Sequence, residues 1–200
     1  MADSNVAIAN LALTKLGDLR ITDLDEDTKP AREVKAVFTM LRDKLLRRYT
    51  WRFSVKRAQL AASATAPEFG YEYQYPLPTD CLRVIQVGEF YPPPNLADLN
   101  TGNDAEWQIE GRSILHHQSG PLKIRYVRRV TDPVQFDACF DEAFACLIAH
   151  NTAEALTQSN SKKEAARQDF NQAIRDANFA NAIENPPVSL ADNAWLAARL

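Results

Sequence analysis

Glycine and proline are concentrated in the middle of this 200-residue chain, and their distribution constrains the fold more than any other feature of the sequence. Five of the six glycines lie between Gly70 and Gly120, and seven of the eleven prolines lie between Pro67 and Pro121. Both residue types disfavour helix interiors and mark turns between strands. The chain is therefore predicted to form helices, then a β-rich region, then helices again.

Four segments carry apolar residues at helical spacing, two on each side of the middle region. The first helix is expected from about Ser4, its N-cap, to Leu16, with Gly17 just past its end. The second is expected to begin near Thr28, because Pro30 is tolerated in a first turn. Two more are expected after residue 133, separated by a break at 159–161 and ending near residue 183.

Alternating apolar and polar residues predict strands in the middle region. They are expected over residues 51–60, 71–75, 81–87, 106–110, 112–116 and 122–130, with a loop at 92–104. The aromatic residues Trp51, Phe53 and Trp107, with those at 71–75, are interpreted mainly as the core of this β layer. Base stacking is disfavoured because no known nucleic-acid-binding pattern surrounds them.

These elements predict an α+β fold organised as a single composite domain over residues 1–200. Residues 1–50 and 133–183 are expected to form an antiparallel bundle of about four helices. Residues 51–132 form an inserted, mainly antiparallel β-rich region, and residues 184–200 form an extended C-terminal tail.

Composition and charge exclude several classes of protein. With 46% apolar and 24% charged residues, the chain is not wholly disordered. No apolar run approaches the roughly 20 residues of a membrane span, so no membrane partner is expected. The net charge of −3 is not that of a dedicated nucleic-acid binder. Residues 1–5 carry no secretory signal, so synthesis in the cytosol with reduced cysteines is expected.

The sequence contains no recognisable catalytic or cofactor motif, whether a phosphate-binding glycine loop, HExxH or GxSxG. His116 and His117 are adjacent on an expected strand, so they point to opposite faces and are interpreted as an exposed strand end. Cys139 and Cys146 lie seven residues apart and are interpreted as small core residues. We therefore expect no enzyme activity, no catalytic residue, no metal and no cofactor.

A strongly basic segment is the first feature with a functional interpretation. Residues 42–57 hold seven cations against the single acid Asp43, in an otherwise acidic chain; the cations are Arg42, Lys44, Arg47, Arg48, Arg52, Lys56 and Arg57. The segment could face phosphate or an acidic partner. It could equally be a solvated face whose cations complement the helix dipole. Arg128 and Arg129 would extend it or lie at its rim.

The C-terminal tail is the second such feature. After Pro186 and Pro187 the chain ends with four large apolar residues, at Leu190, Trp195, Leu196 and Leu200. Free chain ends are usually polar, so these residues are expected to dock on the chain's own core, a neighbouring subunit or a partner groove.

Several segments together resemble the head-to-tail adaptor proteins of short-tailed phages, the tail tubular protein A family. They are ALTKLG at 12–17, ITDLD at 21–25, LRDKLLR at 41–47, WRFSVKRAQL at 51–60 and YQYPLPTDCLRV at 73–84. The resemblance covers roughly residues 10–90, and beyond them it is one of architecture. Ser54 replaces the alanine typical of the family, and Tyr49-Thr50 replaces a common His-Pro.

The resemblance implies a structural virion protein without enzyme activity. Such proteins form a dodecameric ring that joins the portal protein to the tail nozzle protein, with a tail fibre as a further contact and genomic DNA in the lumen. The expected location is the tail and neck of the virion, with assembly in the host cytoplasm. On this hypothesis the 42–57 cations face the portal or the DNA channel, and the C-terminal tail docks on the portal or the adjacent subunit.

Two alternatives stay open. The first is a nucleic-acid-binding regulatory protein that uses the basic 42–57 segment. The second is a head-completion connector of another tailed-phage type, which also forms rings but lacks the β insertion.

Overall fold

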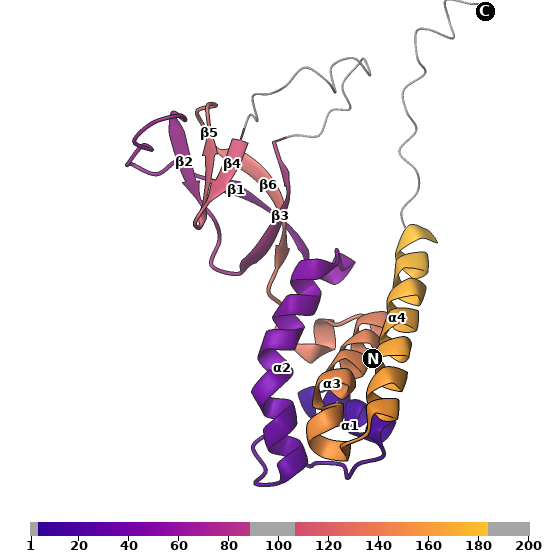
Figure 1. Cartoon of the computed structure of the whole chain (residues 1–200). Helices are drawn as coiled ribbons and strands as arrows, with labels where there is room; N and C mark the ends of the chain where they lie inside the picture. The colour runs from indigo at the N-terminus through magenta and orange to yellow at the C-terminus, as the bar shows by residue number, and fades with distance from the viewer. Residues whose placement is uncertain (1–3, 89–106, 184–200) are drawn as a thin grey trace, which may run out of the picture. The chain divides into compact units, whose positions relative to one another are not determined.

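The computed structural model describes residues 4–88 and 107–183, which divide into two compact units (Figure 1). The helical unit comprises residues 4–56, 80–83 and 127–183, and the β unit comprises residues 57–79, 84–88 and 107–126. The helical unit thus includes residues 51–56, 80–83 and 127–132, which the sequence pattern assigned to the β region. The expected loop at 92–104 and the C-terminal tail, with Leu190, Trp195, Leu196 and Leu200, lie outside the described residues.

Both ends of the first helix and the start of the second lie where their capping residues predict. Helix α1 spans Asn5–Leu16, and the hydroxyl of Ser4 accepts a hydrogen bond from the Ala7 N–H at 3.1 Å. Gly17 ends the helix in the left-handed region, at φ 65°. Helix α2 spans Lys29–Arg48 with Thr28 as its N-cap. Local capping therefore sets these boundaries.

Helix α3, Ala138–Thr157, is the central helix of the helical unit and packs against α1, α2 and α4 (Figure 1). Helix α4 spans Asn160–Ile183. Most of α3 is buried, and its Phe140 ring lies 4.7–5.6 Å from the rings of Trp51, Phe53, Phe136 and Phe144. Edge-on and tilted ring contacts of this kind add to the hydrophobic stabilisation of the unit.

Six described strands form two sheets of three strands each. Their bounds are Val55–Leu60 (β1), Tyr73–Pro76 (β2), Cys81–Val87 (β3), Trp107–Glu110 (β4), Ser113–His116 (β5) and Leu122–Arg128 (β6). The first sheet has the order β1-β6-β3, and the second has the order β2-β5-β4. In the second sheet β5 pairs antiparallel with both neighbours. The α+β class and the helical bundle predicted from the sequence are confirmed.

The prediction of one continuous strand over 51–60 is wrong at its start. Arg52–Ser54 form a 3₁₀ turn, η1, before β1 begins at Val55. The Ser54 N–H and hydroxyl both donate to the Trp51 carbonyl, at 3.0 and 2.7 Å, and close this turn. The Trp51 indole in turn donates to the Leu45 carbonyl at 3.3 Å, so Trp51 belongs to the helical core and not to a β layer.

Two further interpretations from the sequence are also corrected. Trp107 is 36% exposed on the edge strand β4 and is not a core residue. His116 is buried and is not an exposed strand end, because β5 is the central strand of its sheet. Only His117 is exposed, and its ring stacks on Tyr71 with centroids 4.8 Å apart.

Candidate polyanion-binding surface

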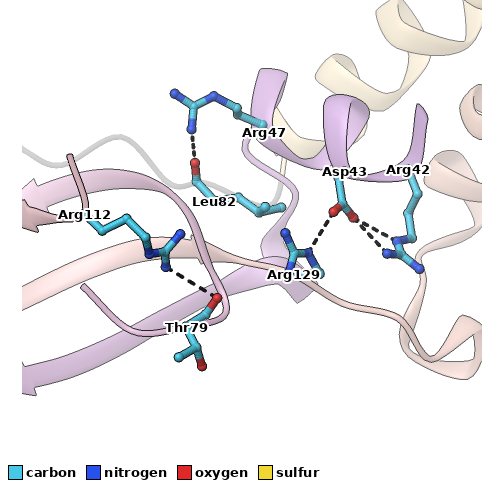
Figure 2. Close-up of polar contacts among 7 residues, drawn as sticks. All are labelled: Arg42, Asp43, Arg47, Thr79, Leu82, Arg112 and Arg129. Carbon is cyan, nitrogen blue, oxygen red and sulfur yellow. Dashed lines mark hydrogen bonds and ion pairs between the residues drawn. The ribbon is translucent and has the colours of Figure 1, made fainter. Parts of the chain in front are cut away.

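One carboxylate, Asp43, joins the end of α2 to the end of β6 (Figure 2). The Arg42 guanidinium donates twice to Asp43 Oδ1, at 3.0 and 2.9 Å, and the Arg129 Nε donates to Oδ2 at 2.7 Å. The Arg42 side chain is only 8% exposed, whereas that of Arg129 is 45% exposed. Asp43 therefore compensates a buried charge and orients an exposed one.

The first residues of β3 bring a second set of arginine contacts. Arg47 on α2 donates to the carbonyl oxygen of Leu82 (Figure 2), and Arg83 donates to the Thr50 hydroxyl at 2.6 Å. These bonds hold both guanidiniums close to the C-terminal end of α2. A guanidinium held by its neighbours loses less conformational entropy when it binds an anion.

The end of β6 and the start of β1 complete the surface. Arg128 donates to the Gln135 side-chain oxygen at 2.7 Å. The Lys56 ammonium lies 3.6 Å from an Asp80 carboxylate oxygen, in a pair whose side chains are about half and one-third exposed. An ion pair this exposed contributes little stability and leaves the cation available to a second anion.

We call the resulting set of cations in the helical unit the basic cluster. It consists of Arg47, Lys56, Arg83, Arg128 and Arg129, together with Arg52, which is exposed in η1 next to Phe53, whose carbonyl accepts a hydrogen bond from Arg128 at 3.5 Å. Two nearby carboxylates, Asp43 and Asp80, offset only part of this charge. The surface is chemically suited to phosphate, because guanidinium groups present several N–H donors in a fixed plane to phosphate oxygens.

The seven cations of the basic segment differ in their surroundings. Arg42 is buried and serves the fold. Lys44 and Arg48 are exposed one helical turn apart, and the Arg48 guanidinium lies 5.4 Å from the Tyr49 ring centroid. Arg57 is exposed but belongs to the β unit. Only Arg47, Arg52 and Lys56 of the segment enter the basic cluster.

The other cluster members come from distant parts of the sequence. Arg128 donates to the Phe53 carbonyl and to the Gln135 side chain, and Arg129 donates to Asp43, so both lie beside the basic segment. Of the two alternatives that the sequence left open, this is the one in which they extend the segment. Arg83 was not identified as a site residue from the sequence. Its position at the start of a strand, directly after the turn at 79–80, gave no sign that it would reach Thr50.

The buried histidine and one of the buried cysteines are accounted for by local structure. His116 Nδ1 accepts a hydrogen bond from the Gln118 N–H at 2.7 Å. Burial raises the pKa of the Cys146 thiol to about 11, which makes it an unreactive core residue. Across residues 4–88 and 107–183, no three His, Cys, Asp or Glu side chains gather as a metal site would require.

Two further findings complete the description of this surface and its chain. No helix in the described part of the chain has the length and apolar character needed to cross a bilayer. Neither a protein-family model nor a curated protein sequence matches this chain.

Proposed function

We propose that this protein is a structural component of a short-tailed phage, the head-to-tail adaptor that joins the portal to the tail nozzle. On this proposal the chain forms a ring, a dodecamer in the virion, whose lumen carries the genomic DNA. The observation that carries the proposal is the basic cluster, a set of positioned cations on a chain whose net charge is −3. The motif resemblance over residues 10–90 supports the same assignment.

The chemistry of the basic cluster fits contact with DNA of any sequence. Its members are arginines and one lysine held at the surface of a folded unit, and phosphate contacts of this kind carry no sequence information. A channel wall needs this property, because the whole genome passes through it. If each subunit makes only a few such contacts, each contact is weak, so DNA can move past the ring while the whole ring still holds it.

The direct test of the adaptor function is a mixing experiment with the portal protein of the same virus. The full-length chain is added to purified portal, and the mixture is followed by size-exclusion chromatography and electron microscopy. We expect a ring of this protein to appear on one face of the portal. A chain that never co-elutes with portal, at any ratio, would refute the adaptor assignment.

Shortening the C-terminal tail provides a second test of assembly. A chain that ends at Glu184 lacks Leu190, Trp195, Leu196 and Leu200 and is expected to lose binding to the portal or to its neighbour. Normal portal binding and ring assembly by the shortened chain would remove the tail from the proposal while leaving the rest in place.

Contact with DNA is tested by neutralising three cluster members together, Arg47→Gln, Arg52→Gln and Lys56→Gln. Each lost phosphate contact should reduce the slope of log affinity against log salt by about 0.9, so the triple variant should lose between 2 and 3 units, roughly. The probe is a random-sequence DNA duplex. The matched control is Arg20→Gln with Lys29→Gln and Arg175→Gln, which removes the same charge from exposed positions outside the cluster.

The same cluster also supports the runner-up, a nucleic-acid-binding regulatory protein. The two functions differ in what the isolated chain does. A regulator binds DNA tightly and with a steep salt dependence as a monomer, whereas an adaptor binds DNA weakly until it is assembled. Tight binding without portal, together with no portal complex, would favour the regulator. The described β unit weighs against the head-completion connector, which lacks such an insertion.

A further inference from the structure

The β unit carries a groove of about 650 Å³ along one face of the β2-β5-β4 sheet. One wall is the segment 65–71, and the floor is formed by alternate residues of the three strands. The strand register brings these floor residues together, since Glu110 pairs with Ser113 and both Gln74 and Gln108 pair with Leu115. Its volume lies in the range of pockets that bind side chains or small ligands.

The groove is acidic and aromatic. It is lined by Glu68 and Glu110 and by the aromatic residues Phe69 and Tyr71, and the lining residues that the structure describes include no Lys, Arg or His. The Phe69 side chain is 87% exposed, which is unusual for so large an apolar group. Carboxylates and aromatic faces both attract cations, so the groove suits a lysine or arginine side chain beside an apolar one.

The helical unit exposes a matching set of side chains, which we call the α2 stripe: Met40, Lys44 and Arg48. These residues lie four apart on α2 and therefore share one helix face. The Met40 side chain is 61% exposed, and neither Lys44 nor Arg48 has an acidic partner in the described part of the chain. At the other end of α2, by contrast, Arg32 and Lys35 are paired with Asp27 and Asp25.

We propose that the α2 stripe of one copy of this chain occupies the acidic groove of the next copy. Lys44 and Arg48 face Glu68 and Glu110, and Met40 packs against the Phe69 ring, a favourable sulfur–aromatic contact. The two surfaces are different, so the contact is heterologous and repeats from copy to copy, which produces rings or filaments. The inference rests on the proposed ring and names the surfaces that would close it.

The test is an exchange of charge between the two surfaces in the full-length chain. Variant A carries Glu68→Arg and Glu110→Arg, and variant B carries Lys44→Glu and Arg48→Glu. Self-association is measured by sedimentation velocity at low and high salt. The wild type is expected to associate at low salt, and each variant alone should associate at least tenfold more weakly, roughly, because both of its surfaces then carry the same sign.

A mixture of variants A and B restores opposite charge at every contact and should associate again. This rescue cannot come from misfolded protein, and all four substituted positions are exposed. Matched controls are Glu72→Arg, an exposed acid of the β unit outside the groove, and Arg20→Glu with Lys29→Glu in the helical unit. The controls should associate as the wild type does.

Three outcomes would overturn the inference: a wild type that stays monomeric at low salt, variants that associate as strongly as the wild type, or a mixture without rescue. The portal experiment separates this inference from the proposed function. A chain that binds portal but fails the exchange test keeps the adaptor function and loses only this interface. A chain that passes the exchange test but ignores portal keeps the interface and loses the adaptor function.

Discussion

Replacing Asp43 with Asn tests whether the carboxylate, and not merely a hydrogen-bond acceptor, holds the end of α2 in place. The amide keeps the size of the side chain and one acceptor oxygen but removes the charge that compensates Arg42. Because the Arg42 side chain is only 8% exposed, its guanidinium cannot recover the lost interaction from water. The substitution therefore leaves an uncompensated, nearly buried cation.

The expected loss of stability is about 3 kcal/mol, at the lower end of the range for breaking a buried ion pair. The lower end applies because Asp43 itself is 22% exposed and part of its interaction with Arg42 is already screened. The contribution of Arg129 to this loss is under about 1 kcal/mol, since its side chain is 45% exposed. Most of the effect should thus come from Arg42.

The assay is urea unfolding monitored by far-ultraviolet circular dichroism. The free energy of unfolding is extrapolated to zero urea, and its slope against urea concentration is compared between variants. Arg129→Gln is the matched control and should cost less than about 1 kcal/mol. Adding Arg42→Met to Asp43→Asn should recover much of the loss, because the methionine removes the buried charge and keeps most of the apolar stem. An Asp43→Asn variant whose free energy of unfolding lies within about 1 kcal/mol of the wild-type value would refute the reasoning.

Three further predictions concern single positions. Gly17→Ala should cost about 1 kcal/mol in urea unfolding, because Gly17 ends α1 at φ 65°, where a Cβ is strained. Tyr75→Phe should cost about 1–2 kcal/mol in the same assay, because the buried Tyr75 hydroxyl bonds the Gln118 and Gly120 carbonyls, at 2.7 and 2.9 Å. Cys146 should react with iodoacetamide roughly 100-fold more slowly in the folded chain at mildly alkaline pH, as read by mass spectrometry, because burial raises its pKa from 9.0 to about 11. Because the pKa of Cys146 is raised in the folded chain, the stability that its protonated thiol contributes is complete below pH 9.0 and is lost as the pH rises towards 11. Cys146→Ala should lessen this loss of stability at alkaline pH.

The parts of the fold that could be predicted from the sequence are those fixed by local chemistry. A serine or threonine before an apolar run and a glycine after it bind the free backbone groups of a helix, so Ser4, Gly17 and Thr28 marked their helix ends. Strand β3, Cys81–Val87, matched its predicted bounds because a turn precedes it and Gly88 follows it. These signals need no knowledge of distant residues.

The part that was predicted incorrectly depended on distant residues. Trp51, Phe53 and Val55 alternate as a strand would, and the same spacing allows a 3₁₀ turn. The 3₁₀ turn is favoured because the rings of Phe136 and Phe140, more than eighty positions further along the chain, pack against Trp51 and Phe53. A tertiary contact of this kind overrides a local pattern, and the local pattern carries no trace of it.

The candidate site, too, was predicted from the sequence only where its residues are close in the chain. A linear run of cations was visible, yet Arg83 and Arg129 reach it only because β3 and β6 return to the end of α2. One signal for the burial of Arg42 did exist in the sequence. Arg42 lies four residues after Phe38 and three before Leu45, so it shares their apolar helix face, and a cation on that face needs a compensating acid close by.

The basic segment therefore combines two roles that sequence alone cannot separate. Arg42 stabilises the fold through Asp43, whereas Arg48, less than two turns later, is exposed and contributes little to it. Loss of Arg42 would lower binding to any partner to the extent that it destabilises the helical unit. Loss of Arg48 would lower binding only if that side chain contacts the partner. A substitution in residues 42–57 is thus informative about function only when the stability of the same variant is measured beside its binding.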